Sequence, residues 1–464
     1  MTEPSWLTVL PPFLAIGLAL FTRQVYLALF AGIWLGFFLL NDSGVLPSLA
    51  QALDGVLAVL ANPGDARVVM FTLVIGAFIV TLERCGAVSG FVQFLERSRW
   101  VTNGKRAQWM AWLVGLVIFI ESNITVLVAG TVSRPLFDRF RIAREKLAYI
   151  IDSTSAPVCM LIPLNAWGAF NLGLLDGLGV QDPLGVLLAT IPLNLYAITA
   201  ILLTAYTISR NYNPGPMATA EARTIGGDKD GIELSSATGE KSSVKPRVLN
   251  MLLPVVTLIV AMPLGLWITG DGKIFDGSGS TSVLWASLAA LTMVSVLVLL
   301  QRSMSLDELS HTWMEGAGRM LPLAIILVLA LALGAVSKAL GTGQFVAGLV
   351  GDSIPVALLP VVIFVVSGVI AFAVGSSWGT FSIMLPIAVP VAAALGADPV
   401  LFVAAVLSGG IFGDHASPIS DTTIVSSLAA GTEHIEHVRT QLPYALRAGA
   451  VSAVGFVALG FVLL

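Results

Sequence analysis

The chain has 464 residues, of which 56% are apolar and only 11% are charged. Soluble domains carry about 25% charged residues, so this composition and a mean hydropathy of +0.90 exclude a soluble protein. They predict a multi-pass helical protein of the cell (inner) membrane, with the lipid bilayer as its solvent. A net charge of −4 without a basic stripe excludes nucleic acid as a partner.

Residues 1–210 are predicted to form an N-terminal membrane repeat. The first apolar run has no basic segment before it and no small-residue cleavage site after it, so we expect a retained span and not a signal peptide. The run 108–132 is flanked by basic loops, which places both of its ends in the cytoplasm. It is therefore predicted to be a re-entrant hairpin with Glu121 near its tip. The alternative is a true span beside one loop that violates the charge rule.

A broken helix is predicted near residues 147–175, because Pro157 and Pro163 interrupt a polar stretch that begins at Asp152. Residues 211–247 have mixed charge and no hydrophobic periodicity, which predicts a mobile cytoplasmic linker. Segments with mostly acidic charges are expected to be loops on the outer face: 41–67, 176–182, 271–282 and 341–355. Both termini are predicted to lie outside as well.

Residues 248–464 are predicted to form a second membrane repeat. The run 356–395 is too long for one span, has acidic flanks and carries GSSWGTF at its centre, so we expect a hairpin that enters from outside. Pro418 predicts a second broken helix near 400–430. Each repeat then has about five spans and one hairpin. Because the number of spans is odd, the second repeat has the opposite orientation in the membrane to the first. The sequence thus predicts an all-α polytopic membrane protein with two inverted repeats and broken helices at the midplane, the architecture of secondary transporters.

Four acidic residues are predicted to lie at membrane depth: Glu121, Asp152, Asp414 and Asp421. An ionised side chain costs about 3 kcal/mol there unless it is paired or solvated. Because broken helices expose carbonyl oxygens, carboxylates beside them suit Na⁺ or Li⁺, and the same groups can carry protons. We expect Na⁺ at Asp152 and Asp414. The supporting or substrate-lining residues are expected to be Ser122, Asn123, Thr125, Ser153, Ser155, Asn165, Trp167, Ser376, Ser377, Trp378, Thr380, His415, Ser417, Ser420 and Thr422.

Other interpretations stay open for some of these side chains. Structural roles would be helix caps for Asp152 and Asp421 and core packing for Trp167, Trp378 and His415. His415 is otherwise a candidate proton relay beside Asp414. Two further histidines, His434 and His437, fall in a polar cytoplasmic segment, and we interpret them as solvated surface.

Four long motifs resemble the NhaC-type Na⁺/H⁺ antiporter family: REKLAYIIDSTSAPV (144–158), GSSWGTFSIMLPIAVPVA (375–392), SGGIFGDHASPISDTTIVSS (408–427) and HVRTQLPYAL (437–446). The resemblance runs from about residue 68 to the C-terminus. It implies a monovalent cation/proton antiporter, although some members exchange organic acids such as malate and lactate. It also implies two hairpins that carry substrate sites on a moving domain. The residues to which it assigns roles are Asp152, Ser155, Asp414, Ser417, Asp421 and Thr422. The chain departs from this subgroup where Glu121-Ser122 replaces paired acids, which puts the ion stoichiometry in question.

Two functions follow as hypotheses. The first is a Na⁺(Li⁺)/H⁺ antiporter in which both ions compete for the same carboxylates, with elevator-like alternating access and a static homodimer interface. The alternative is a Na⁺- or H⁺-coupled exchanger or symporter of a small organic acid or amino acid, with Asn123, Asn165, Trp167 and Trp378 touching the solute. Four acids without an intramembrane base favour the first. An enzyme is not expected, because no zinc cluster or Ser/Lys dyad is present, and no cofactor is expected.

Overall fold

The computed structural model describes residues 6–22, 24–41, 44–87, 89–90, 101–119, 122–163, 165–226, 245–273, 277–345 and 355–464. All regular secondary structure in these ranges is helical, which confirms the predicted all-α fold. Eight helices in this part of the chain are long and apolar enough to cross a membrane, or up to ten if each bent helix pair is one span. The multi-pass membrane prediction is therefore confirmed as well.

The first half of the chain contains the following helices: η1 (Trp6–Val9), α1 (Leu10–Thr22), α2 (Val25–Asn41), α3 (Val45–Ala61), α4 (Pro63–Arg84), α6 (Gly104–Val117), α7 (Ser122–Arg139), α8 (Arg144–Leu161), α9 (Ala166–Gly177), α10 (Pro183–Ala189), η2 (Ile191–Leu193), α11 (Leu195–Arg210) and α12 (Pro216–Ile225). The second half contains α13 (Leu249–Thr269), α14 (Gly279–Leu300), α15 (Leu306–Leu340), η4 (Val356–Leu358), α17 (Leu359–Val374), α18 (Ser377–Ala394), α19 (Pro399–Ala416), α20 (Asp421–Ala430) and α21 (His434–Leu463).

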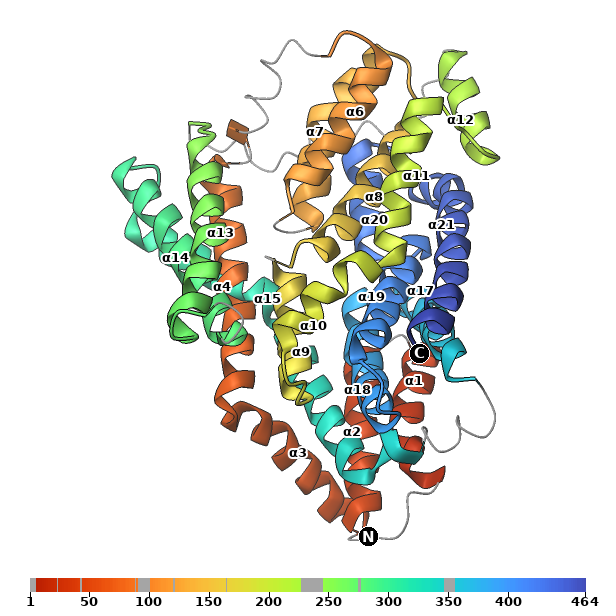
Figure 1. Ribbon diagram of the computed structural model, residues 1–464. Helices are drawn as coiled ribbons and strands as arrows, with labels where there is room; N and C mark the ends of the chain where they lie inside the picture. Colours follow the sequence, from red (N-terminus) through yellow and green to blue (C-terminus); the bar gives the residue numbers. More distant parts are fainter. Residues whose placement is uncertain are drawn as a thin grey trace.

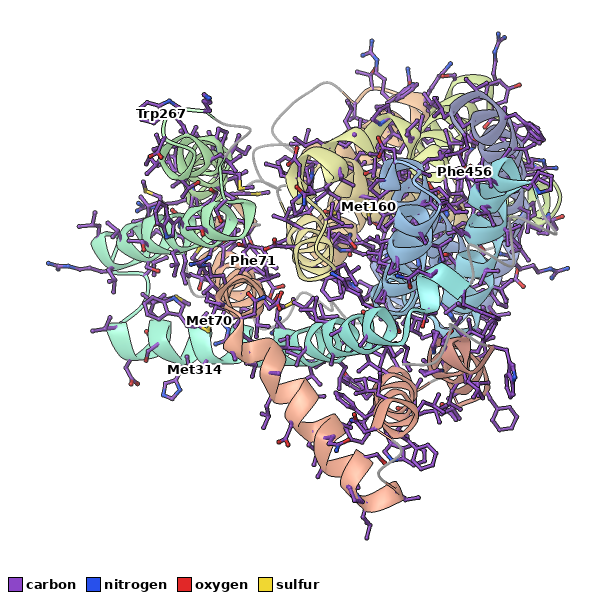
Figure 2. The ribbon with its side chains drawn as sticks, turned by 60° about the horizontal axis from the view of Figure 1, so that its bottom comes forward. Met70, Phe71, Met160, Trp267, Met314 and Phe456 are labelled. Atoms are coloured by element: carbon purple, nitrogen blue, oxygen red, sulfur yellow. The ribbon has the colours of Figure 1, made fainter. Side chains whose placement is uncertain are left out.

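The helices form two groups that are visible in Figure 1. In the smaller group, on the left, α4 packs against α14 and α15, and α13 packs against α14. The larger group contains α6 to α8, α11 and α17 to α21. The 35-residue helix α15 connects the groups, because it also packs against α2 and α18. In Figure 2, Phe71, Trp267 and Met314 lie in the smaller group, whereas Met160 and Phe456 lie in the larger one.

Two helix breaks lie where polar residues and proline interrupt apolar sequence. α8 and α9 are bent by 41° relative to each other, and Pro163 lies in the break between them. The expected interruption at Pro157 is wrong, because this proline lies inside α8. α19 ends at Ala416 and α20 begins at Asp421, with Pro418 between them. Proline cannot donate to the helical hydrogen-bond ladder, so the chain turns at this point.

A third break separates α17 from α18. Gly375 ends α17 in the left-handed conformation, with φ of 70°, which glycine adopts without steric cost. Ser376 then caps α18, since its Oγ accepts a hydrogen bond from the Gly379 backbone N–H at 3.3 Å. α17 and α18 pack against each other, as do α6 and α7.

A close helix contact near the polar centre joins α17 to α19. A Cβ atom on Gly413 would lie 2.0 Å from the Gly368 carbonyl oxygen, and one on Gly409 would lie 2.3 Å from that of Phe364. Because both obstacles are backbone atoms, they cannot move without displacing a helix. The small residues therefore set how near α17 lies to the helix that carries Asp414.

We expect Gly413→Ala to push these helices apart and to cost about 2 kcal/mol of stability. The measurement is the thermal unfolding midpoint of the purified protein in detergent. Gly318→Ala in α15 is the matched control, because a Cβ there meets nothing within 4 Å. Equal midpoints for the two variants would show that this helix contact is not tight.

Two segments expected to lack regular structure are helical. Residues 45–61, within the predicted outer loop 41–67, form α3. Residues 216–225, within the predicted mobile linker 211–247, form α12, which packs against α8 and α21. Two apolar residues at helical spacing, Met217 and Ala220, are enough to dock this helix, because both are buried. Part of the linker is therefore docked on the membrane helices.

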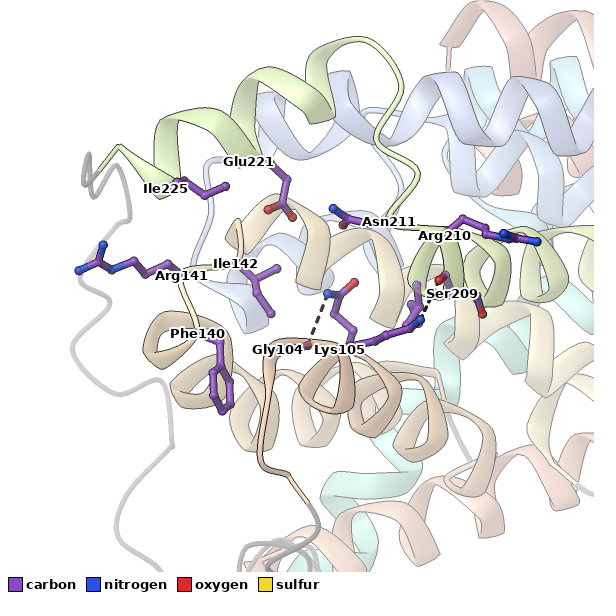
Figure 3. Close-up of a pocket in the computed structure, with 12 residues that line it drawn as sticks. Gly104, Lys105, Phe140, Arg141, Ile142, Ser209, Arg210, Asn211, Glu221 and Ile225 are labelled. Carbon is purple, nitrogen blue, oxygen red and sulfur yellow. Dashed lines mark hydrogen bonds between the residues drawn. The ribbon is translucent and has the colours of Figure 1, made fainter.

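Buried charge fixes α12 to the start of α8 (Figure 3 shows the neighbouring cavity). The ammonium of Lys146 is fully buried, lies 3.3 Å from Glu221 Oε1 and donates to Asn211 Oδ1 at 2.8 Å. Burial raises the pKa of Glu221 above its usual range, and the nearby Lys146 offsets part of this effect. A second ion pair joins Arg223 to Glu145.

We expect Glu221→Leu to cost about 3 kcal/mol of docking free energy, because it leaves the buried Lys146 without its counter-charge. The result would be faster cleavage by trypsin after Arg223 in α12. The double variant Lys146→Met with Glu221→Leu removes both charges and should return cleavage towards the rate of the unmodified protein. A single variant that is cleaved at the unmodified rate would contradict this role of the pair.

Candidate functional site

Asp152, in the middle of α8, is the centre of a buried polar cluster and is only 1% exposed. Its Oδ2 accepts hydrogen bonds from Gln441 Nε2 at 2.7 Å and from Thr423 Oγ1 at 3.2 Å. The Nε2 atoms of His415 and His437 each lie 3.9 Å from the same oxygen. Four helices, α8, α19, α20 and α21, therefore meet at one carboxylate.

His415 connects this cluster to α11. Its Nε2 lies 3.1 Å from Ser153 Oγ, and its Nδ1 lies 2.6 Å from the Tyr196 hydroxyl. Its backbone oxygen accepts a hydrogen bond from Gln441 Nε2 at 2.7 Å. Both ring nitrogens thus have hydroxyl partners, which a neutral imidazole satisfies in either tautomer. The ring is buried and hydrogen-bonded, whichever further role it has.

Asp414 directly precedes His415 in α19 and is 2% exposed. Its Oδ2 accepts a hydrogen bond from Ser377 Oγ at 3.1 Å. Ser377 is the first residue of α18, so the break after Gly375 is what brings this hydroxyl to the carboxylate. The start of α18 and the last turn of α19 therefore meet at Asp414.

One oxygen of each carboxylate has no hydrogen-bond donor in the described part of the chain. Asp152 Oδ1 and Asp414 Oδ1 are buried and accept no hydrogen bond from the residues that the structure describes. Within the same ranges, the ion-pair partners of Asp152 are histidines, and neither Lys nor Arg pairs with either carboxylate. A buried carboxylate oxygen without a partner is costly. The arrangement suits a bound proton or a small cation.

The cluster does not resemble a transition-metal site. In the described ranges, no group of three or more His, Cys, Asp and Glu side chains is placed to hold a metal ion. A hard monovalent cation makes no such demand, because hydroxyl and carbonyl oxygens can complete its coordination. The hydroxyls of Ser377 and Thr423 supply oxygens of this kind beside the two carboxylates.

Asn165 holds the break between α8 and α9 together. Its Oδ1 caps α9 by accepting from the Gly168 N–H at 3.0 Å. Its Nδ2 donates to the carbonyls of Cys159 and Ile162, each at 2.7 Å, and of Phe119 at 3.1 Å. Phe119 lies in the break after α6. The amide is therefore occupied by backbone partners, and it joins the α6 and α8 breaks.

Trp167 and Trp378 lie side by side, with ring centroids 4.9 Å apart. Trp378 also contacts Phe170 edge-on at 5.0 Å, and Trp167 contacts Phe381 at 6.0 Å. Trp167 is 1% exposed, so its ring packs in the core between α9 and α18. The packing interpretation fits Trp167, whereas Trp378 is only half-buried.

Most of the other predicted site residues have hydroxyl groups that donate to backbone carbonyl oxygens. Their hydroxyl contacts are Thr125 to Ile118 O, Ser155 to Asp152 O, Thr380 to Ser376 O, Ser417 to Phe372 O, and Ser420 to Thr422 Oγ1. Ser122 is buried at the start of α7. Asp421 begins α20 with an exposed side chain, and its Oδ1 accepts from the Thr422 N–H at 2.9 Å. Glu121 and the Asn123 side chain lie outside the described residues.

The interpretation of His437 as solvated surface is wrong. This ring is fully buried in the second turn of α21, and His434, one turn earlier, is half-buried. Both Nδ1 atoms face one hydroxyl, that of Ser427, at 2.8 and 3.0 Å. The polar composition of HIEH gives no sign of this burial. The burial depends on the packing of α21, which brings His437 to Asp152.

The Nε2 atoms of His434 and His437 both face hydrogen-bond acceptors. His434 Nε2 lies 2.6 Å from the Pro418 carbonyl oxygen, and His437 Nε2 lies 2.8 Å from Gln441 Oε1. Each Nε2 must therefore carry a proton. Ser427 has one hydroxyl proton, and the Thr423 carbonyl oxygen at 2.8 Å is a further acceptor for it. Two neutral rings therefore leave at least one Nδ1 without a donor.

Four residues of the cluster were absent from the predicted site: Tyr196, Thr423, His437 and Gln441. Gln441 and His437 fall within the motif HVRTQLPYAL, whose i and i+4 spacing places them on one face of a helix. That spacing is the signal that could have found them. Nothing in the sequence pairs Tyr196 with His415, because the contact depends on how α11 and α19 pack.

The sequence model described as the Na⁺/H⁺ antiporter family matches residues 171–461. An uncharacterised protein of Haemophilus influenzae is 33% identical over 98% of this chain and 91% of its own length. A malate-2H⁺/Na⁺-lactate antiporter of Bacillus subtilis is 32% identical, but over only 21% of each chain. The crystal structure of the YdaH transporter of Alcanivorax borkumensis has a similar fold, with a TM-score of 0.60 and 16% identity over 90% of both chains.

Proposed function

Because the chain belongs to the Na⁺/H⁺ antiporter family, we propose that it exchanges Na⁺ or Li⁺ for protons at Asp152 and Asp414. The two ions compete for the same carboxylate oxygens, so that binding of one displaces the other. No separate coupling device is then needed. We assign the protein to the NhaC-type members of the family on the four motifs given above, two of which contain Asp152 and Asp414.

One observation carries this proposal. Each of the two buried carboxylates has one oxygen that accepts no hydrogen bond in the described part of the chain. The other oxygen of each is held by hydroxyl or amide donors, which orient the carboxylate without neutralising it. An oriented, charged and unsatisfied oxygen binds a proton or a cation, and both cannot occupy it together.

The architecture proposed for this exchange consists of two inverted repeats, residues 1–210 and 248–464, around the carboxylates. Helix pairs α6/α7 and α17/α18 are the proposed re-entrant hairpins, and their mutual packing supports this. Asp421 and Glu121 are proposed to serve as further cation or proton ligands. Elevator-like movement of the larger helix group, outward-facing termini, a homodimer and the cell membrane complete the proposal.

The experiment is transport by purified protein in proteoliposomes that contain a pH-sensitive dye and no organic solute. An inward Na⁺ gradient should drive protons out and alkalinise the lumen in proportion to the gradient, and Li⁺ should replace Na⁺, whereas K⁺ should not. Proton flux that is absent with Na⁺ alone but appears with malate, lactate or an amino acid would overturn the proposal. It would favour coupled exchange of an organic solute.

A further inference from the structure

Gln441 lies where α21 packs against α8 and α19, in the larger helix group (Figure 1), and is 1% exposed. Its Nε2 donates to Asp152 Oδ2 and to the His415 carbonyl oxygen, each at 2.7 Å. Its Oε1 accepts from His437 Nε2 at 2.8 Å. One buried amide therefore joins a candidate ion-binding carboxylate to the end of a second helix and to a buried imidazole.

The orientation of this amide is fixed by its partners. A carboxylate oxygen and a backbone carbonyl oxygen can only accept hydrogen bonds, and the NH₂ group has two protons, one for each of them. The reversed amide would place Oε1 against both acceptors and its NH₂ group against the protonated Nε2 of His437. Gln441 therefore cannot turn without losing its bonds to Asp152, His415 and His437.

The His415 carbonyl oxygen depends on this donor. In an uninterrupted helix, the N–H of Ile419 would donate to it. α19 ends before Ile419, whose N–H donates instead to Ser417 Oγ at 3.3 Å. No backbone N–H in the described ranges takes its place. Gln441 thus completes the last turn of α19, which is the turn that carries Asp414.

Gln441 also holds one side of the Asp152 carboxylate. Oδ2 accepts from Gln441 at 2.7 Å and from Thr423 at 3.2 Å, so the amide makes the shorter of these two bonds. A carboxylate that is held at Oδ2 keeps Oδ1 in one place. Rigid oxygen ligands select a cation by its size, whereas a mobile carboxylate can close around a smaller ion.

We propose that Gln441 is a positioning residue that sets the relative affinity of the site for Na⁺ and Li⁺. It holds Asp152 against the end of α19, so that Oδ1 cannot move in around the smaller ion. This inference rests on the proposed exchange of Na⁺ or Li⁺ at Asp152. It adds a determinant of ion preference that does not itself bind the ion.

The test is the dependence of proton flux on Na⁺ and on Li⁺ concentration in proteoliposomes that contain a pH-sensitive dye. Gln441→Met keeps the length of the side chain and removes both donors. It should raise the half-saturating Na⁺ concentration about tenfold and that of Li⁺ only about threefold. The maximal rate should change by about twofold at most, because the residue acts on ion binding.

Gln301→Met is the matched control. Gln301 exchanges two hydrogen bonds with Asn250, at 2.7 and 3.1 Å, and joins α13 to the end of α14 in the smaller helix group. The substitution also removes amide hydrogen bonds, so it matches the loss of stability but not the position. It should leave the ratio of the two half-saturating concentrations unchanged.

Gln441→Asn is the second variant, because it keeps the amide but is one methylene too short to reach both Asp152 and His415. It should shift the ratio in the same direction, and it decides the question if Gln441→Met is not recovered folded. An unchanged ratio in a folded Gln441 variant, with both concentrations raised equally, would overturn this inference alone. An unmodified protein that gives no Na⁺- or Li⁺-driven flux would instead overturn the proposed function, and this inference with it.

Discussion

Asp152→Asn and Asp414→Asn are each expected to reduce Na⁺-driven proton flux at least 100-fold in proteoliposomes, with little change in thermal stability. At Asp152, the asparagine oxygen can still accept the hydrogen bonds from Thr423 and Gln441. Its NH₂ group, however, replaces the oxygen that accepts no hydrogen bond in the described part of the chain. A donor then points where the cation or proton must bind, and the negative charge is lost.

Asp398→Asn is the matched control for these variants. Asp398 caps α19, the helix that carries Asp414, and its Oδ1 accepts from the Val400 N–H at 2.9 Å. Asparagine caps helices as well as aspartate does, so flux should remain near that of the unmodified protein. Retained flux in both site variants would show that Asp152 and Asp414 have a structural role and do not bind the transported ions.

Asn165→Asp should prevent the protein from accumulating in a folded state. The substitution keeps the shape of the side chain but places a carboxylate oxygen against the carbonyls of Phe119, Cys159 and Ile162. The loss of these bonds and the burial of an unpaired charge together cost about 5 kcal/mol or more. The measurement is the fraction of monodisperse protein recovered by size-exclusion chromatography in detergent.

Asn165→Ala is the comparison, because it removes the same hydrogen bonds without adding a charge. It should be recovered in larger amounts than the aspartate variant and should unfold at a lower temperature than the unmodified protein. If Asn165→Asp folds as well as Asn165→Ala, then the amide does not face three carbonyl oxygens. The joint between the α6 and α8 breaks would then be held by other contacts.

Composition alone predicts the helical membrane fold, because the energetic penalty of charge in a bilayer acts on every residue. The carboxylates could be singled out for the same reason. Asp152 and Asp414 are conspicuous in apolar sequence, and both prove to be buried. The sequence does not, however, predict which donors they meet. Thr423 is 271 positions from Asp152, and packing of α8 against α20 is what brings the two together.

The sequence predictions that proved wrong, for the histidines of α21 and for α12, also have physical explanations. The histidines of α21 were placed on the surface because their neighbours are charged, yet a helix can bury one face and expose the other. His437 and Gln441 share the buried face, whereas Glu433 and Arg439 are exposed. The docking of α12 was missed because it depends on ion pairs with α8 and on two small apolar contacts.

Proton release on Na⁺ binding tests the central claim most directly. Purified protein in weakly buffered detergent solution is mixed with NaCl or with choline chloride, and a pH indicator reports the protons released. If Na⁺ and H⁺ compete for Asp152 and Asp414, then Na⁺ should release protons, choline should not, and both Asn variants should release fewer. Na⁺ that binds without releasing protons would contradict the account.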